Sequence, residues 1–239
     1  MSDHSRDRSS FSDRLNVFLS HHRTTLLVLS VIVIVGIVAT VVIAQLSNNR
    51  AERGALAAEQ IEELWGEWQA SRPSSEEEEI SPETAALEES LRAAIADTIE
   101  ELPRRYGALR GRFVLGELEW ELGNFDAARG AFLAVAEEHP DSHLAAIALF
   151  SAAAAAENAG DPDAATTIYG RIVAGEGDPN AEVAHALFNL GRIAEAQGDA
   201  DLALDYYNRL IDEHGGSTWT NLGRNRIIWL TSRGVGSGE

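Results

Sequence analysis

The sequence contains no cysteine and no lysine, and it has only one methionine and six prolines in 239 residues. Without cysteine the chain cannot form disulfides, bind a metal through thiolates or carry a lipid on a cysteine side chain. All 19 basic residues are arginines, and 38 acidic residues bring the formal net charge to −19. Affinity for nucleic acid depends largely on basic residues that neutralise phosphates, so we expect no nucleic acid among the partners.

A long uncharged run stands near the N-terminus. Residues 26–44 read LLVLSVIVIVGIVATVVIA, and about 20 apolar residues are enough to cross a bilayer as a helix. We therefore predict a transmembrane helix over residues 25–46, preceded by a leader of residues 1–24. Basic residues near a span favour the cytoplasmic side; two follow the run, Arg50 and Arg53, and four precede it: Arg6, Arg8, Arg14 and Arg23.

These observations predict a single-pass protein of a bacterial inner membrane, with its N-terminus in the cytoplasm and the remainder in the periplasm. Residues 51–239 hold 14 Arg against 35 acidic residues, a net charge of −21. A cleaved signal peptide is the alternative, because Val42 and Ala44 are small residues at the spacing of a cleavage site. The uncharged run is longer than the roughly 7–15 residues of a typical signal core.

The rest of the chain has the pattern of helices. We predict a juxtamembrane helix and an acidic linker over residues 47–82, where the sequence SRPSSEEEEISPE has no apolar face. From 83 to 233, apolar residues recur at intervals of three and four, and Ala and Leu dominate. This spacing is typical of amphipathic helices, so the predicted fold class is all-α, with residues 234–239 as a tail.

One set of residues recurs three times between residues 105 and 214. A small residue is followed by a glycine, an alanine and an aromatic residue, at an interval of 37 and then 38 residues: Gly116, Gly123, Ala128, Phe132; Ala153, Gly160, Ala165, Tyr169; and Gly191, Gly198, Ala203, Tyr207. Each set fits a pair of helices, here called helix A and helix B. The small residue and the alanine allow close packing, and the glycine ends helix A in a left-handed turn. Asn124, Asp161 and Asp199 stand where they can cap helix B.

This pattern resembles the tetratricopeptide repeat. The predicted units are a partial one at about 84–103, three at 109–142, 146–179 and 184–215, and a cap at 218–232. Pro140 closes the first complete unit, whereas Gly177 and Gly215 stand at that place later. The resemblance implies an α-solenoid of stacked hairpins that binds other polypeptides. With its span, the chain also resembles bacterial ancillary translocon subunits of the YfgM type, and its repeats resemble the YbgF (CpoB) type. These imply an adaptor for secretion or envelope chaperones, or an envelope and cell-division coordinator.

No catalytic motif is present in the sequence. It has no HExxH, P-loop, GxSxG or Gly-rich dinucleotide turn, and we predict no catalytic, cofactor-binding or metal-binding residue. His139 and His214 occupy equivalent helix ends, where an imidazolium can meet the negative end of the helix dipole. An enzyme with an unrecognised site is the alternative class of function.

The resemblance also indicates where a partner would bind. In tetratricopeptide domains the A helices line the concave face, and one Phe stands three residues before each small residue. Charged and aromatic residues lie beside them, which suits a peptide held by apolar anchors and oriented by charges. The candidate partner-binding residues are Phe113, Glu117, Trp120, Phe150, Glu157, Phe188, Arg192 and Glu195. The alternative is that the three Phe are core residues bridging neighbouring A helices.

Overall fold

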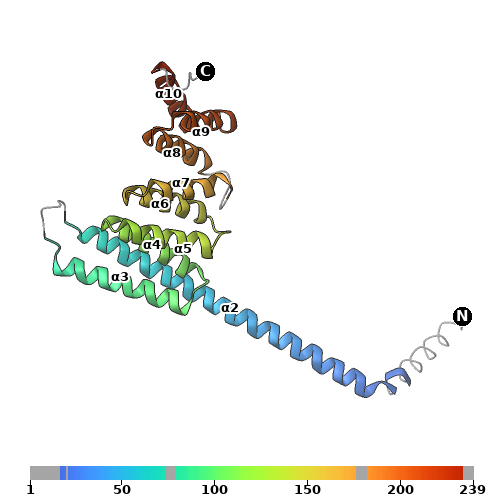
Figure 1. The fold of residues 1–239 in the computed structure, drawn as a ribbon. Helices are drawn as coiled ribbons and strands as arrows, with labels where there is room; N and C mark the ends of the chain where they lie inside the picture. Colours follow the sequence, from blue (N-terminus) through green and yellow to red (C-terminus); the bar gives the residue numbers. More distant parts are fainter. Residues whose placement is uncertain (1–16, 20, 74–78, 176–181, 234–239) are drawn as a thin grey trace, which may run out of the picture. The chain divides into compact units, whose positions relative to one another are not determined.

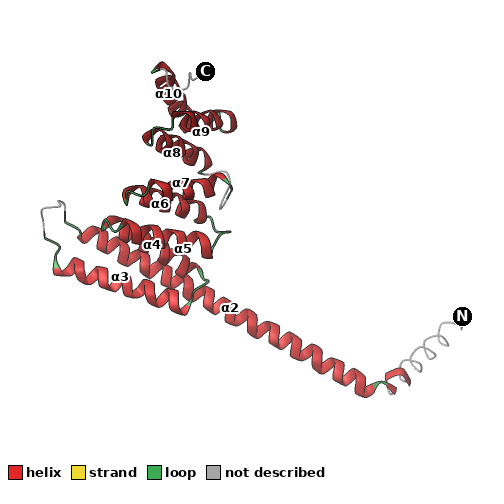
Figure 2. Cartoon of the chain, in the orientation of Figure 1, coloured by secondary structure: helices red, strands yellow, loops and turns green. Residues whose placement is uncertain are grey.

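The computed structural model describes residues 17–19, 21–73, 79–175 and 182–233. All regular elements within these ranges are helices, and no strand occurs among them (Figure 2). The predicted all-α fold class is confirmed. Gly177, expected to replace the closing proline, lies outside the described residues.

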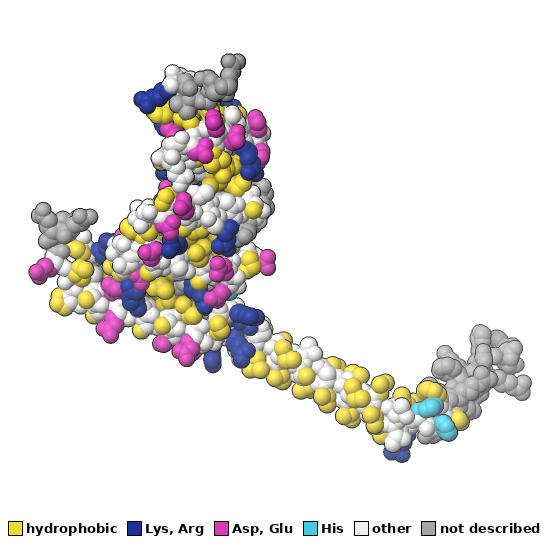
Figure 3. Space-filling view, in the orientation of Figure 1, with side chains coloured by type: hydrophobic (Ala, Val, Ile, Leu, Met, Phe, Trp, Pro, Cys, Tyr) yellow, Lys and Arg dark blue, Asp and Glu magenta, His cyan; other side chains and the backbone are white. Residues whose placement is uncertain are grey.

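The chain divides into two compact units, residues 1–52 and 53–239. Helix α2, Arg23–Ser71, begins in the first unit and ends in the second. Its most apolar 18-residue window has a mean hydropathy of 3.3, and none of this window is buried. Figure 3 shows this hydrophobic covering of the helix. The helix is long and apolar enough to cross a membrane, and a signal sequence near the N-terminus meets the same criteria.

The second unit is a stack of helical hairpins (Figure 1). Each helix from α3 onward packs on its neighbours in the chain, which is the arrangement of a solenoid. The helices are α3 Pro82–Glu101, α4 Tyr106–Glu121, α5 Phe125–Glu138, α6 Ala145–Asn158, α7 Pro162–Val173, α8 Val183–Ala196, α9 Ala200–Glu213 and α10 Thr218–Ser232. The A helices are α4, α6 and α8, the B helices are α5, α7 and α9, and α10 follows in the place of another A helix.

The C-terminal part of α2 belongs to the solenoid core. Ile61 and Trp68 are fully buried, and the Trp65 and Trp68 rings stack with their centroids 5.1 Å apart. They share one hydrophobic cluster with residues of α3 and α4, namely Leu91, Ile95, Val114 and Leu118. Residues 53–71 thus act as the A helix of the partial unit, with α3 as its B helix. The core therefore starts before residue 83, where the sequence pattern had suggested that the folded part begins.

In the first and third complete repeats, the glycine of helix A makes room for the aromatic ring of its own B helix, whereas the second repeat has Ala153 at this position. A Cβ atom added to Gly116 would lie 2.5 Å from Cε1 of Phe132, and one added to Gly191 would lie 2.5 Å from Cε1 of Tyr207. The atoms nearest to the glycine are therefore those of the ring, a contact that the sequence pattern did not predict. The repeated alanines of the B helices are fully buried, as Ala128 shows.

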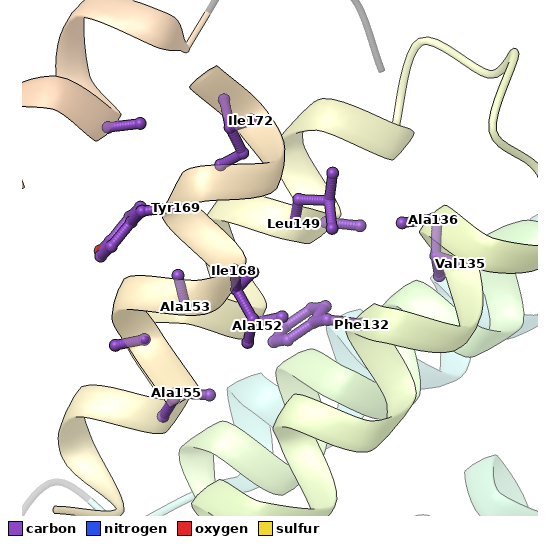
Figure 4. Packing of buried hydrophobic residues seen from close by; sticks show 14 of the residues in the cluster. Phe132, Val135, Ala136, Leu149, Ala152, Ala153, Ala155, Ile168, Tyr169 and Ile172 are labelled. Atoms are coloured by element: carbon purple, nitrogen blue, oxygen red, sulfur yellow. The ribbon is translucent and has the colours of Figure 1, made fainter. Parts of the chain in front are cut away.

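Between repeats, apolar side chains from three successive helices interlock. Figure 4 shows this packing around α5, α6 and α7, with the labelled residues Phe132, Val135, Leu149, Ala152, Ile168, Tyr169 and Ile172. Since one hairpin leaves an apolar face uncovered, each added hairpin buries the face of the one before.

The predicted turns are confirmed at all three A–B junctions. Gly123, Gly160 and Gly198 have φ values of 76°, 78° and 83°, a region in which side-chain-bearing residues are strained. Asp161 and Asp199 then accept hydrogen bonds from the backbone N–H of Ala164 (3.0 Å) and Leu202 (3.1 Å), as caps should.

The cap expected of Asn124 is wrong, because this side chain makes no capping hydrogen bond. Its Nδ2 instead donates to Oε2 of Glu119 at 2.9 Å. The amide therefore ties the junction to helix A rather than to the start of helix B.

The glycine–ring contact predicts opposite effects for two glycine substitutions. Gly116→Ala should lower the free energy of unfolding by about 1–3 kcal/mol, because it forces the Phe132 ring out of its place. Gly130→Ala should raise it by about 0.5–1 kcal/mol, since Gly130 lies within α5 and nothing stands within 4 Å of an added Cβ. Urea unfolding of the detergent-solubilised chain, followed by circular dichroism, measures both. Equal effects of the two substitutions would contradict the packing argument.

Candidate functional site

The three Phe residues predicted to bind a partner, Phe113, Phe150 and Phe188, are here called the Phe ladder. They lie partly in the core and partly at the surface. Phe113 is 8% exposed and buried, whereas Phe150 and Phe188 are half-buried. Each ring packs on the aromatic residue of its own B helix, at centroid distances of 5.3 Å (Phe113–Phe132), 5.5 Å (Phe150–Tyr169) and 5.8 Å (Phe188–Tyr207). The three Phe therefore support the hairpins, and only the second and third also leave part of a ring accessible.

Two further aromatic residues extend this ladder across the last A helices. The His185 ring lies 4.0 Å from the Phe150 centroid and stacks on Trp219 of α10 at 3.6 Å. Trp219 also packs on Phe188 at 5.4 Å. Sequence reasoning missed both residues, although His185 stands three residues before Phe188 and so lies on the same helix face.

His185 is held as a neutral imidazole. Burial, and secondarily the charge of Arg192, lowers its pKa from 6.5 to about 4. The carboxylate of Glu182 lies 3.5 Å from His185 Nδ1, but burial raises the pKa of this carboxyl. The ion-pair attraction is therefore weaker than the cost of burying a charged ring.

Glu157 joins two repeats. Its Oε1 accepts a hydrogen bond from the Tyr169 hydroxyl at 3.0 Å, within its own hairpin. Its Oε2 accepts from Nη2 of Arg192, which comes from the next A helix, and Arg192 Nε also donates to Oδ1 of Asn189 at 3.2 Å. Two predicted partner-binding residues, Glu157 and Arg192, thus already bind each other.

Glu195 repeats the arrangement one unit later. The Tyr207 hydroxyl donates to its Oε2 at 3.3 Å, and Arg226 of α10 donates through Nε at 3.0 Å and also through Nη2. Burial and the negative charge of Glu195 raise the pKa of Tyr207 to about 12. The phenol therefore remains a hydrogen-bond donor, and Glu195 is tied to the fold.

The first complete repeat differs from the other two. Trp120 stands at the position of Glu157 and Glu195, and Phe132, which has no hydroxyl, stands at the position of the two tyrosines. The A helices of this region, with Phe132 of α5, form a pocket of about 330 Å³. It is lined by Trp65 and Gln69 of α2, Glu117, Trp120 and Glu121 of α4, Phe132, and Phe150, Ser151 and Ala154 of α6.

The pocket contains three of the eight predicted residues, Glu117, Trp120 and Phe150. Trp65 and Gln69 were missed because the residues before the acidic linker were interpreted as a juxtamembrane segment. The sequence does contain a signal of a buried helix face here. Trp65 and Trp68 are three residues apart in an otherwise polar stretch.

The negative charge of the Glu117 carboxylate is only partly balanced by its neighbours. Burial raises its pKa, the charges of Glu62 and Glu121 raise it further, and Arg110 opposes them. The nearest Arg110 nitrogen, Nη2, is 3.6 Å from Oε2, and Arg110 also forms an ion pair with Glu62. Glu117 Oε2 is buried and accepts no hydrogen bond from the described residues.

The pocket offers a ligand aromatic rings and carboxylates. Two other predictions from the sequence concern metal binding and the histidine at the end of α5. Within the described ranges, no group of three or more His, Asp or Glu side chains is placed to hold a metal ion. His139 ends α5, but burial and the charge of Arg112 lower its pKa. The imidazolium expected at this helix end is therefore disfavoured.

Comparison with known proteins agrees with the geometry. The model of a family described as tetratricopeptide repeat matches residues 85–143, 113–182 and 150–218. Together these cover residues 85–218, more than half of the chain. No curated protein matches.

The low pKa of His185 predicts acid sensitivity. Between pH 6.5 and about 4 the unfolded chain binds a proton at this residue that the folded chain does not, so its contribution to stability is present above pH 6.5 and is lost as the pH falls toward 4. His185→Phe keeps an aromatic ring and removes the titration. The stability of the wild type relative to this variant, measured by urea unfolding from pH 7 to pH 4, should therefore decrease. A difference that is constant over this range would contradict the neutral imidazole.

Proposed function

The chain belongs to the tetratricopeptide repeat family, and from this premise we propose that it binds partner polypeptides through the A-helix surface at the pocket of the first complete repeat. Tetratricopeptide repeats are protein–protein interaction scaffolds, and the family is typically non-catalytic. The chain is thus an interaction scaffold, and the pocket is our assignment of where it binds.

The observation that carries this assignment is the position of the three predicted residues that share one cavity. Trp120 and Phe150 offer partly accessible rings, and Glu117 and Glu121 place carboxylates beside them. Binding energy at protein interfaces concentrates at aromatic and charged residues in such concave places. By contrast, Glu157, Arg192 and Glu195 form ion pairs between neighbouring repeats.

We also propose that the chain is anchored in a bacterial inner membrane through residues 25–46. The excess of Arg before the apolar run supports a cytoplasmic N-terminus and periplasmic repeats. An anchored repeat domain of this kind would assist secretion or envelope chaperones, as the resemblance to the YfgM type suggests. The envelope and cell-division role of the YbgF type is the alternative, favoured if the apolar run is cleaved.

Ala154 offers a way to test the pocket without removing any core side chain. It is half-buried, lines the pocket, and stands at the repeat position that Arg192 occupies in the next unit. Ala154→Arg should therefore be compatible with the fold, yet obstruct the pocket. We expect crosslinked capture of partners in native membranes to fall by about tenfold or more.

The matched control is Ala127→Arg, which places the same side chain at an exposed position of α5. It should leave capture unchanged, and both variants should keep the helical signal of the wild type. Capture that persists in the Ala154→Arg variant would remove the pocket from the binding surface.

Topology has a direct test because the chain lacks cysteine. A membrane-impermeant maleimide should label Glu89→Cys in intact spheroplasts, since Glu89 is exposed on α3. Ser9→Cys should be labelled only after lysis. Labelling in the reverse order, or a mature protein beginning near Gln45, would contradict the anchored topology.

A further inference from the structure

We propose that the pocket receives a cationic side chain, an arginine or lysine of a partner polypeptide, between the rings of Trp65, Trp120 and Phe150 and beside the carboxylates of Glu117 and Glu121. This inference rests on the proposed function, because it names the chemistry of the partner that the same pocket selects.

The repeats themselves show what an A-helix carboxylate requires. Glu157 of α6 binds Arg192 of α8, and Glu195 of α8 binds Arg226 of α10, so each acid is met by an arginine of the following A helix. In α4 the position of these two acids is occupied by Trp120, with Glu121 next to it and Glu117 one turn before it, and in α6 the position of Arg192 is occupied by Ala154. The small side chain leaves space at the point where the next interface holds a guanidinium.

The charges of the pocket favour a cation. It is lined by two acidic residues, and no arginine or histidine is among the described residues that line it. Arg72 pairs with Glu121, and Arg110 lies near Glu117 at 3.6 Å. These arginines do not complete the Glu117 site, since Glu117 Oε2 accepts no hydrogen bond from any residue in the described ranges.

Two arginines of this chain are themselves held by an aromatic ring together with a carboxylate. Arg72 lies over the Trp68 ring at 5.1 Å while it pairs with Glu121, and Arg226 lies over Trp229 at 4.7 Å while it pairs with Glu195. A cation over an aromatic face is attracted by the quadrupole of the ring. The rings of Trp65, Trp120 and Phe150 in the pocket offer a guest the same attraction.

The charge of the whole extracytoplasmic segment points in the same direction. Residues 51–239 carry a formal charge of −21, and Figure 3 shows acidic side chains distributed over the second unit. Such a surface attracts a basic segment and repels an acidic one before contact. A partner ending in carboxylates would in addition face Glu117 and Glu121.

The test uses the full chain in nanodiscs and a phage-displayed library of short random peptides. Peptides that bind the Ala154→Arg variant equally well are discarded, so that pocket-dependent peptides remain. We expect these peptides to share an arginine or lysine. A synthetic copy with citrulline in place of that arginine should bind about tenfold more weakly by fluorescence anisotropy, because citrulline keeps the shape of arginine and loses its charge.

Two variants separate the role of Glu117 from the total charge. Glu117→Gln should weaken the arginine peptide by about tenfold and leave the citrulline peptide nearly unchanged, a coupling expected only if the two charges meet. Glu89→Gln removes one charge at an exposed position of α3 and should change neither affinity.

Each outcome has a separate meaning. Pocket-dependent peptides with apolar or acidic anchors, or equal binding of the arginine and citrulline peptides, would overturn the cationic partner and leave the proposed binding pocket intact. If no peptide distinguishes the wild type from the Ala154→Arg variant, the binding pocket and the cationic partner both fail.

Discussion

The packing of the first and third complete repeats depends on the contact between one glycine of helix A and one aromatic ring of helix B. At Gly116 and Gly191 the ring of the B helix lies so close that an added Cβ would be 2.5 Å away. This contact fixes where the far edge of the ring lies. In the third repeat that edge carries the hydroxyl of Tyr207, the second repeat has Tyr169 at the same position, and each hydroxyl donates to a glutamate of helix A.

The polar contacts of the A helices differ according to whether the B helix carries a tyrosine or a phenylalanine. Tyr169 and Tyr207 each donate to a glutamate of their own hairpin, and that glutamate then binds an arginine of the next A helix. Where Phe132 replaces tyrosine, Trp120 replaces glutamate, and the chain of polar contacts is interrupted. Buried or half-buried polar groups need partners, so the same sequence position either links two repeats or lines a pocket.

Sequence reasoning predicted what depends on local geometry. The left-handed glycines and the Asp161 and Asp199 caps are set by residues within one turn of each other, and the 37–38-residue interval revealed the units. Sequence reasoning failed for contacts between residues that are distant in the chain. The pairing of Glu157 with Arg192 spans 35 residues, and nothing in the pattern distinguishes a charge aimed at a partner from one aimed at the next repeat. The burial of Trp65 was missed for a similar reason, since the acidic linker separates α2 from the helices it packs on.

The absence of lysine is consistent with this architecture. A guanidinium is planar and presents several donors at once, so it can stack on a ring while it binds a carboxylate. Arg226 does both, with Trp229 beneath it and Glu195 beside it. Lysine, a compact charge with a strong hydration shell, satisfies only one of these contacts well. In the first complete repeat the rings and carboxylates are present and the arginine of the following A helix is replaced by Ala154. Together with Trp120 and Phe132, Ala154 distinguishes the repeat that we propose is open to a partner from the two repeats that bind their own chain.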